Sequence, residues 1–439
     1  MRCLSVLFTT FLSFGYTHAF SQDLLTVDDA VAQALEYNYD IQTARTDSTA
    51  YAIDNSFAYA AFLPNLNGTL TRLWNRNNQR QQLSDGTKRG GNGIRSKNLA
   101  MSVGLDWTLF DGLRMFATKE KLAEFVRLGE YTVKEQVVTS VAEVINNYYN
   151  IVRQKQQLKA IEEQISINDE RVQLASKKFS VGLGAKPELL QAKVDYNAQK
   201  AAQLTQQTLI AQLKEQLNQL IGLPVTQYYD VSDSIPINTS LQFGTIRSEL
   251  ETSNPTLQIA RKNIDISRLT VREARADLLP TVTLNSAYNF NRVDNVVVLN
   301  SFTPLFNQNR GFNYGVSVNL PILNNFTNRR LVRQARLDVR LQEINLSNQF
   351  SQLDVSVNNT FKNYELYKKL LNLEEDNILL AKENVSIALQ RFRLGASTYI
   401  ELHEAQISLA EAYDRLIAAR YNTKVAETDL LRLQGNIVR

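Results

Sequence analysis

Two glutamates near the C-terminus, Glu401 and Glu404, are the residues whose type and spacing point most directly to chemistry. Residues three apart lie on one face of a helix, so both carboxylates are expected to project together. Such a pair can exchange protons as general acid and base, or it can attract cations. A structural explanation is also open, because the helix dipole favours acidic residues in the first turns of a helix.

Catalysis by other groups is limited by the residue inventory. The only cysteine is Cys3, and of the two histidines only His403 lies beyond an N-terminal leader. Thiol nucleophiles, histidine-based triads and most zinc or copper sites therefore have too few side chains. We predict that the protein is not an enzyme and holds no metal or cofactor. A carboxylate-based hydrolase stays an alternative, and it requires Glu401 and Glu404 to lie in an enclosed pocket rather than on an open wall.

The first residues have the pattern of a secretory signal peptide. A mostly apolar run at 4–14 follows Arg2, and the triplet at 17–19 fits a signal-peptidase site, so cleavage is expected after Ala19. Cys3 precedes the apolar run and would be removed with the leader. No later stretch is apolar enough for a transmembrane helix. The formal net charge is only +4, and we expect no nucleic-acid partner.

The chain matches itself at a shift of about 215 residues, which indicates an internal tandem duplication. We divide it into a signal peptide (1–19), a first repeat (20–222), a linker (223–244) and a second repeat (245–439). Each repeat is predicted to hold a helix, a β-hairpin, a long helix and a further helix, with hairpins at 63–110 and 279–322. The clearest matches pair Phe179-Ser180-Val181-Gly182 with Phe392-Arg393-Leu394-Gly395, and Leu220-Ile221-Gly222 with Leu433-Gln434-Gly435.

Alternating apolar and polar residues predict four strands, at about 66–74, 99–109, 282–290 and 312–320. Their lengths are near the ten or so residues that cross a bilayer. The connections, at about 75–98 and 291–310, are polar and are predicted as extracellular loops. The basic residues of the first connection could contact anionic lipopolysaccharide, or they could simply be solvated. These residues are Arg76, Arg80, Lys88, Arg89, Arg95 and Lys97.

Apolar residues recur every seven positions in each repeat, from Val137 to Phe179 and from Phe350 to Phe392. Sustained seven-residue spacing predicts a coiled-coil seam. The helix expected at 113–179 would be about 100 Å long at 1.5 Å per residue. The flanking helices, expected at 26–62 and 187–221, would each have about half that length.

Four strands cannot close a barrel, and an open sheet edge in lipid leaves backbone groups unpaired. The predicted fold class is therefore a mixed α/β membrane protein that forms a homotrimer. Four strands per chain would build a 12-stranded transmembrane β-barrel, continued by a long periplasmic α-helical coiled-coil barrel. The residues expected on the inner face of the strands are small or polar, as in a water-filled channel.

With these elements in order, the mature sequence resembles the TolC-like outer-membrane efflux proteins, or outer membrane factors. The resemblance is carried by the duplication, by the opening helix with Ala34-Leu35-Glu36-Tyr37-Asn38, and by Phe-x-x-Gly at 179–182 and 392–395. It implies an outer-membrane exit duct that passively conducts substrates for a tripartite efflux or type I secretion system. The implied partners are two further copies of the chain, a periplasmic adaptor, a proton-driven or ABC inner-membrane transporter, and outer-membrane lipid. A periplasmic coiled-coil adaptor or scaffold is the alternative, but it does not explain the strands.

The resemblance also assigns site residues around two helical hairpin tips. Adaptor contact is expected at Val181, Gly182, Leu183, Leu394, Gly395 and Ala396, where glycine could equally serve only to stop a helix. Glu401 and Glu404 match the family's acidic constriction at the periplasmic entrance, with glutamates in place of aspartates. The family's polar lock is largely missing, because Phe392 and Ser397 stand where a tyrosine and an arginine are expected. Contacts of Arg391 or Arg393 with Glu188 are the predicted substitute.

Overall fold

The computed structural model describes residues 24–299 and 302–437. The predicted signal peptide, with Cys3 and the cleavage site after Ala19, lies outside these residues. In chain order the elements are β1 (Leu24–Leu25), α1 (Val27–Tyr37), α2 (Tyr39–Ser56), the 3-10 helix η1 (Ala58–Phe62), β2 (Asn65–Gln82), β3 (Lys88–Asp111), α3 (Arg114–Ser180), α4 (Lys186–Leu220), β4 (Asp230–Val231), α5 (Phe243–Ser253), α6 (Pro255–Ala276), β5 (Thr281–Val297), β6 (Phe306–Asn319), α7 (Thr327–Arg393) and α8 (Tyr399–Gln434).

The chain divides into two compact units. The unit here called the helical unit comprises residues 24–42, 136–250 and 355–437. The sheet unit comprises the remaining described residues, 43–135, 251–299 and 302–354. The division differs from that into sequence repeats, because α3 and α7 each begin in the sheet unit and end in the helical unit.

The helix expected at 26–62 is broken, so that prediction was wrong. Asn38 has extended backbone angles between α1 and α2 and is buried. Its side-chain oxygen accepts hydrogen bonds from the backbone N–H groups of Asp40 (3.0 Å) and Ile41 (3.1 Å), and its amide donates to the carbonyl of Leu220 (2.8 Å). Asn38 thus caps the start of α2 and also bonds the end of α4. Both interactions stabilise the break between α1 and α2 relative to one continuous helix.

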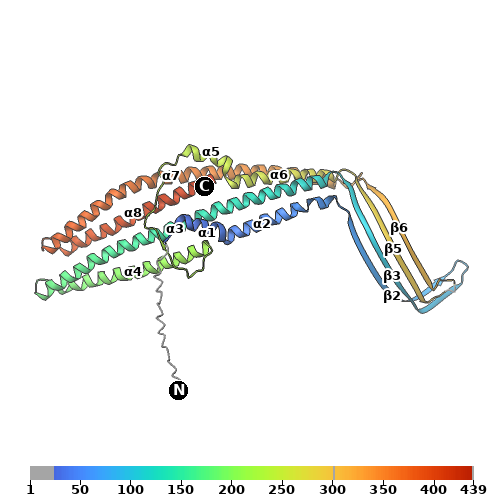
Figure 1. Cartoon of the computed structure of the whole chain (residues 1–439), viewed down its shortest axis with the longest axis horizontal. Helices are drawn as coiled ribbons and strands as arrows, with labels where there is room; N and C mark the ends of the chain where they lie inside the picture. The colour runs from blue at the N-terminus through green and yellow to red at the C-terminus, as the bar shows by residue number, and fades with distance from the viewer. Residues whose placement is uncertain (1–23, 300–301, 438–439) are drawn as a thin grey trace, which may run out of the picture. The chain divides into compact units, whose positions relative to one another are not determined.

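Two helical hairpins form most of the helical unit, and Figure 1 shows α4 beside α3 and α8 beside α7. Both α3 and α7 have 67 residues, which is about 100 Å of helix. The seven-residue seam of α7 is buried at every position from Val357 to Phe392. It packs on small residues of α8 such as Ala405 and Ala412. The coiled-coil prediction is thereby confirmed, since small side chains on one helix let the larger knobs of the other approach closely.

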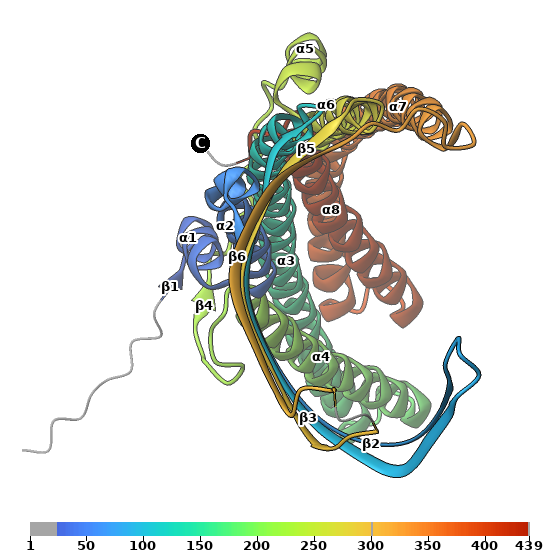
Figure 2. The ribbon, with the colours of Figure 1, turned by 90° about the vertical axis from the view of Figure 1, so that its right-hand side faces the viewer.

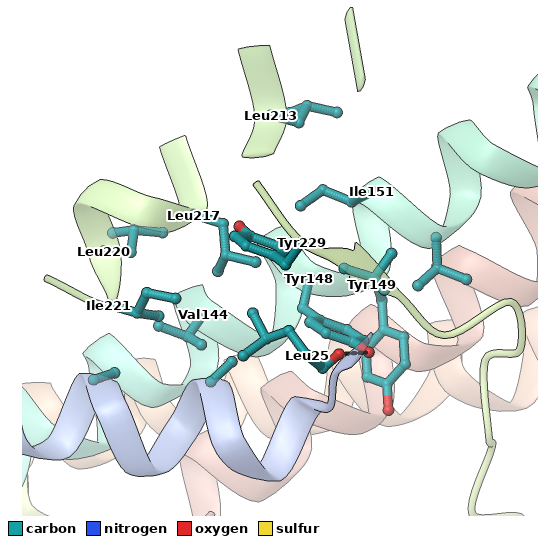
Figure 3. Close-up of a cluster of buried hydrophobic side chains, with 14 residues drawn as sticks. Leu25, Val144, Tyr148, Tyr149, Ile151, Leu213, Leu217, Leu220, Ile221 and Tyr229 are labelled. Carbon is teal, nitrogen blue, oxygen red and sulfur yellow. Dashed lines mark hydrogen bonds between the residues drawn. The ribbon is translucent and has the colours of Figure 1, made fainter. Parts of the chain in front are cut away.

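A second core lies where the chain enters the helical unit. Figure 3 shows Leu25, Val144, Tyr148, Leu217 and other buried side chains from β1, α3 and α4 gathered around one point. The hydroxyl of Tyr148 donates a 2.8 Å hydrogen bond to the carbonyl of Leu25, drawn as the dashed line in Figure 3. Strand β1 pairs in parallel with β4, which follows α4. The segment between the predicted repeats is therefore tied to the start of the chain.

The sheet unit is built on one antiparallel sheet in the order β2-β3-β5-β6. Figure 2 shows its strands as a strongly curved layer. The strands contain 18, 24, 17 and 14 residues, longer than expected. The expectation of long loops at 75–98 and 291–310 was wrong, because β2 continues to Gln82, β3 begins at Lys88, β5 continues to Val297 and β6 begins at Phe306. The polar and basic residues of these segments therefore belong to an exposed part of the sheet and not to a loop.

Within the described ranges, none of the helices combines the length and apolar character that a membrane-spanning helix needs.

Candidate channel entrance and wall

The first hairpin tip is closed by a glycine in the left-handed conformation. Gly182 has φ +76°, and its N–H donates to the carbonyl of Phe179 (3.1 Å). The N–H of Leu183 donates to the carbonyl of Lys178 (2.8 Å). These two bonds form the Schellman arrangement, which satisfies the last carbonyls of α3. No atom lies within 4 Å of a Cβ built at Gly182, so backbone conformation and not space requires the glycine.

The second tip repeats this geometry at the end of α7. Gly395 has φ +74°, its N–H donates to Phe392 (3.2 Å), and the N–H of Ala396 donates to Arg391 (2.9 Å). Leu394 at this tip and Leu183 at the first are 84% and 82% exposed. Large apolar side chains held in solvent on rigid turns are suited to contact with another protein. That the tips meet an adaptor stays a prediction.

Replacing Gly182 with alanine is expected to loosen the first tip without unfolding the unit. A Cβ at positive φ costs about 1–2 kcal/mol, which increases local opening about tenfold. Trypsin should therefore cut after Lys177 and Lys178, in the last turn of α3, about tenfold faster than in the unmodified protein. Gly244→Ala in α5 is the control, because that glycine has open space and no positive φ. Equal cleavage of all three proteins would contradict a conformational role.

The two glutamates lie in the first turns of α8, exposed to solvent. Thr398 caps this helix through a 3.3 Å hydrogen bond from the N–H of Glu401 to its hydroxyl. Glu401 also lies 3.7 Å from Arg391, measured between carboxylate oxygen and guanidinium nitrogen. A groove of about 450 Å³ between α7 and α8 is lined by Arg391, Glu401 and Glu404. Glu401 and Glu404 are thus exposed on an open surface. They do not lie in an enclosed pocket, which the hydrolase alternative requires.

Three further residues had been predicted to form entrance contacts, and two of them have acidic partners in this chain. Arg391 pairs with Glu401 and donates to the carbonyl of Ala396 (3.1 Å). Arg393 pairs with Glu170 of α3. Within residues 24–299 and 302–437, neither arginine forms an ion pair with Glu188. The contact of Arg391 or Arg393 with Glu188 at a closed entrance stays a prediction.

A buried polar cluster next to the tips escaped the sequence analysis. Arg171 of α3 is 1% exposed and forms an ion pair with Asp195 of α4. Its guanidinium also donates to the side-chain carbonyl of Gln406 in α8 (2.9 Å). The hydroxyl of Tyr399 donates to the same Asp195 carboxylate (2.9 Å), and its ring lies 4.9 Å from the guanidinium carbon. One arginine thus joins the first hairpin to the second.

Charge and burial act against each other in this cluster, here called the Arg171 cluster. Burial disfavours the charged form of Asp195, but hydrogen bonds from Gln191, Arg171 and Tyr399 outweigh it and hold the pKa of the carboxyl below its ordinary value. Burial, followed by the hydrogen bond to Asp195, raises the pKa of Tyr399. Asp195 is therefore ionised and Tyr399 protonated at neutral pH, so the cluster is a fixed structural link rather than a proton-exchanging site.

The signal that could have revealed the cluster is a polar residue inside the seam. Asn168 falls three residues after Ile165, at a position where a coiled coil usually places an apolar side chain. Asn168 is buried and accepts a 3.4 Å hydrogen bond from Gln406. Buried polar groups need partners, and Asn168 therefore pointed to a polar network at this level of the helices.

Metal binding has no support from a preformed cluster. Among the described residues, no three His, Cys, Asp or Glu side chains are grouped so that they could hold an ion. Glu401 and Glu404 alone supply two carboxylates from one chain.

The two faces of the sheet differ sharply in chemistry. Side chains alternate between faces along each strand, and the register places like residues in rows across the sheet. One face is small and polar, with Asn67, Thr69, Ser102, Gly104, Asn285, Ala287, Asn289, Gly311, Asn313 and Gly315. On the other face, most residues in the rows up to that of Leu70 are apolar, although Gly68, Ser286 and Arg310 stand among them. The apolar residues of these rows are here called the apolar band, and they are Leu66, Leu70, Met101, Val103, Leu105, Leu284, Tyr288, Phe290, Phe312, Tyr314, Val316 and Val318.

Most of the apolar band is exposed in the single chain, including Leu70, Phe312 and Val318 at 65–66%. Exposed apolar surface of this extent marks contact with a membrane or a partner. A sheet with one apolar face and one small, polar face suits a wall between lipid and water.

Comparison with known proteins agrees with these features. Residues 30–223 and 246–436 match the model of the outer membrane efflux protein family. The outer membrane protein TolC of Escherichia coli is 22% identical over 370 residues, which are 80% of this chain and 72% of that protein. The alkaline protease secretion protein AprF of Pseudomonas aeruginosa is 20% identical over 431 residues, 96% of this chain and 86% of that protein.

Solved structures share the fold. The outer membrane protein VceC of Vibrio cholerae superimposes with a TM-score of 0.73 at 16% identity, covering 93% of this chain and 96% of that one. A match over both hairpins and both helical segments leaves no large part of the chain outside the shared architecture. The chain therefore belongs to the outer membrane efflux protein family and is an outer-membrane exit duct.

Proposed function

We propose that three copies of this chain close into one duct, with a 12-stranded transmembrane barrel above a periplasmic tunnel of helices. The observation that carries the proposal is the sheet order, in which β2 and β6 are edge strands without a described strand partner. An unpaired edge in lipid leaves N–H and C=O groups unsatisfied at several kcal/mol each. Pairing β6 of one copy with β2 of the next removes every edge.

The proposed barrel would turn its apolar band to lipid and its small, polar face to the lumen. Asparagine, serine and glycine in rows across four strands leave room for water and offer hydrogen bonds to it. The curvature of the sheet in Figure 2 is what closure of a barrel requires.

The proposed internal duplication fits the same architecture. In the proposed repeats, 20–222 and 245–439, the structure shows the same devices at matching places. Asn38 and Asn254 each precede a helix and bond its first N–H groups. Gly222 and Gly435, with φ +72° and +79°, end α4 and α8. A duplicated chain in a trimer would give a tunnel with nearly equivalent walls around its axis.

Transport through the duct is proposed to be passive, with no catalytic step. An inner-membrane transporter, proton-driven or of the ABC type, would deliver the substrate, and a periplasmic adaptor would contact the hairpin tips. The exposed Leu183 and Leu394 support that contact. Efflux and type I secretion are both open, since one reported relative is named for protease secretion. Glu401 and Glu404 of three chains would form stacked carboxylate rings at the periplasmic entrance.

Disulfide trapping between edge strands tests the trimer. The predicted mature chain has no cysteine, so introduced pairs are the only thiols. Thr69→Cys in β2 is combined in turn with cysteine in β6; within one chain two strands, or about 14 Å of sheet, separate these positions. At least one pair should give covalent dimers and trimers on denaturing gels. Exclusively monomeric protein for every pair would refute the closure. The β6 positions are Asn307, Asn309, Gly311, Asn313 and Gly315.

A further inference from the structure

A group of basic side chains lies on the same face of the sheet as the apolar band, beginning at the last row of the band and extending toward the hairpin turns. The register places Arg310 in one row with Leu70 and Phe290, and Arg72 in the next row. Lys97 follows beside Trp74, and Arg76 is opposite Arg95 in the row beyond. We call Arg72, Arg76, Arg95, Lys97 and Arg310 the cationic rim.

The charge of the cationic rim is unbalanced within the chain. Asp294 is the acidic residue on this face at the same level; it lies opposite Lys97 in the register and forms an ion pair with Arg292 at 3.0 Å. No member of the cationic rim has an ion-pair partner among the described residues. Arg76 and Arg95 are direct cross-strand neighbours, and like charges in that position are destabilising. An anion bound between them removes the cost.

At this level of the sheet, the basic side chains are confined to the face that we propose contacts lipid. The residues of the opposite face at the same level are Asn75, Asn98, Asn291 and Asn309, all neutral. Basic side chains placed only above the lipid side indicate an anion in the plane of the membrane surface. Aromatic rings lie among them, with the Arg72 guanidinium 5.1 Å from the Trp74 ring centre and Arg292 5.0 Å from that of Phe306. Aromatic and basic residues together are typical of a membrane interface.

An apolar hollow lies directly below the cationic rim. It measures about 540 Å³, and Leu70, Met101, Val103, Tyr288 and Phe290 supply its walls. Gly68 forms part of its floor, and a Cβ built there meets no atom within 4 Å. Gly68 stands in a row with Val103 and Tyr288, so no side chain from β2 fills the space beside them.

We propose that the cationic rim and this hollow form one binding site for a lipid with a phosphorylated headgroup. The phosphates lie among the basic side chains, and an acyl chain fills the hollow over Gly68. The site rests on the proposal that the apolar band faces lipid, and it adds which lipid is held there. Five cations spaced over four rows fit a headgroup with more than one phosphate.

Native mass spectrometry of the trimer tests the site. The protein is reconstituted in phosphatidylcholine vesicles with and without a minor fraction of lipid A, extracted in mild detergent, and analysed for retained lipid. The unmodified trimer should retain lipid A in preference to phosphatidylcholine. The triple variant Arg72→Gln, Arg95→Gln, Lys97→Gln should retain at least about tenfold less lipid A. Each basic residue near an anionic lipid surface increases the binding constant by about a factor of five.

Two further variants separate the explanations. Lys186→Gln, Lys193→Gln, Lys200→Gln in α4 removes the same charge away from the sheet and should retain lipid A normally. Gly68→Leu fills the hollow with every charge intact and should also lower retention; because it keeps all charges, it tests the site even if the triple variant does not fold. Conducting trimers that retain lipid A equally in all variants overturn the lipid site alone. A chain that forms no trimer overturns the site together with the proposed duct.

Discussion

Replacing Arg171 with methionine is expected to destabilise the helical unit by about 3–5 kcal/mol, the largest effect we predict for a single side chain. The guanidinium is 1% exposed and compensates the Asp195 carboxylate, which is itself mostly buried. Removing one partner of such a pair leaves an isolated charge in a poorly solvated place. Thermal unfolding followed by helical circular dichroism should show a clearly lowered midpoint.

Two comparisons isolate the buried charge as the cause. Arg420→Met breaks an ion pair with Glu375 in which the arginine is 36% and the glutamate 48% exposed, and it should cost less than about 1 kcal/mol. The double variant Arg171→Met, Asp195→Asn removes both charges and should recover a large part of the loss. If the single and double variants unfold alike, packing of the arginine stem and not charge explains its effect.

Neutralising both glutamates of α8, Glu401→Gln with Glu404→Gln, is expected to change how the open duct conducts ions. In the proposed trimer the pair would supply six carboxylates around one constriction, an arrangement that favours cations and holds divalent ions. Conductance in planar bilayers should be cation-selective and blocked by divalent cations in the unmodified protein. The block should be at least about tenfold weaker in the variant, because several charges act together at short range.

A control with equal charge loss is available on α7. Asp376→Asn with Glu383→Gln removes two exposed carboxylates outside the groove that holds Glu401 and Glu404. This variant should keep its divalent block. An unchanged block in the α8 variant would show that Glu401 and Glu404 serve only the helix N-terminus, where Thr398 already caps the backbone.

Features that depend on local repetition were predicted well. The heptad pattern placed the long helix at 113–179, and α3 is found at Arg114–Ser180. Gly182 and Gly395 both have the left-handed conformation that ends a helix, and a left-handed residue after a helix is almost a property of glycine itself. Periodicity and backbone preference are written in neighbouring residues, so no tertiary information is needed to recognise them.

The ends of the strands were predicted poorly, because the alternation that marks a strand needs one apolar face. Beyond Trp74 both faces become polar or basic, and the sequence there has the composition of a loop although backbone pairing continues to Gln82. Asn38 was misjudged for a related reason. Its effect on the helix depends on a hydrogen bond to Leu220, a residue 182 positions away.

Sequence patterns were thus sufficient for the helix lengths, the turn glycines, the alternating strands and the family. Tertiary structure decided which polar groups meet. Arg171, Asp195 and Tyr399 come from three helices, and the cationic rim is assembled from β2, β3 and β6. Their proximity follows from strand register and from the packing of one hairpin on the other. Both depend on contacts among residues far apart in the chain, which composition and spacing do not encode.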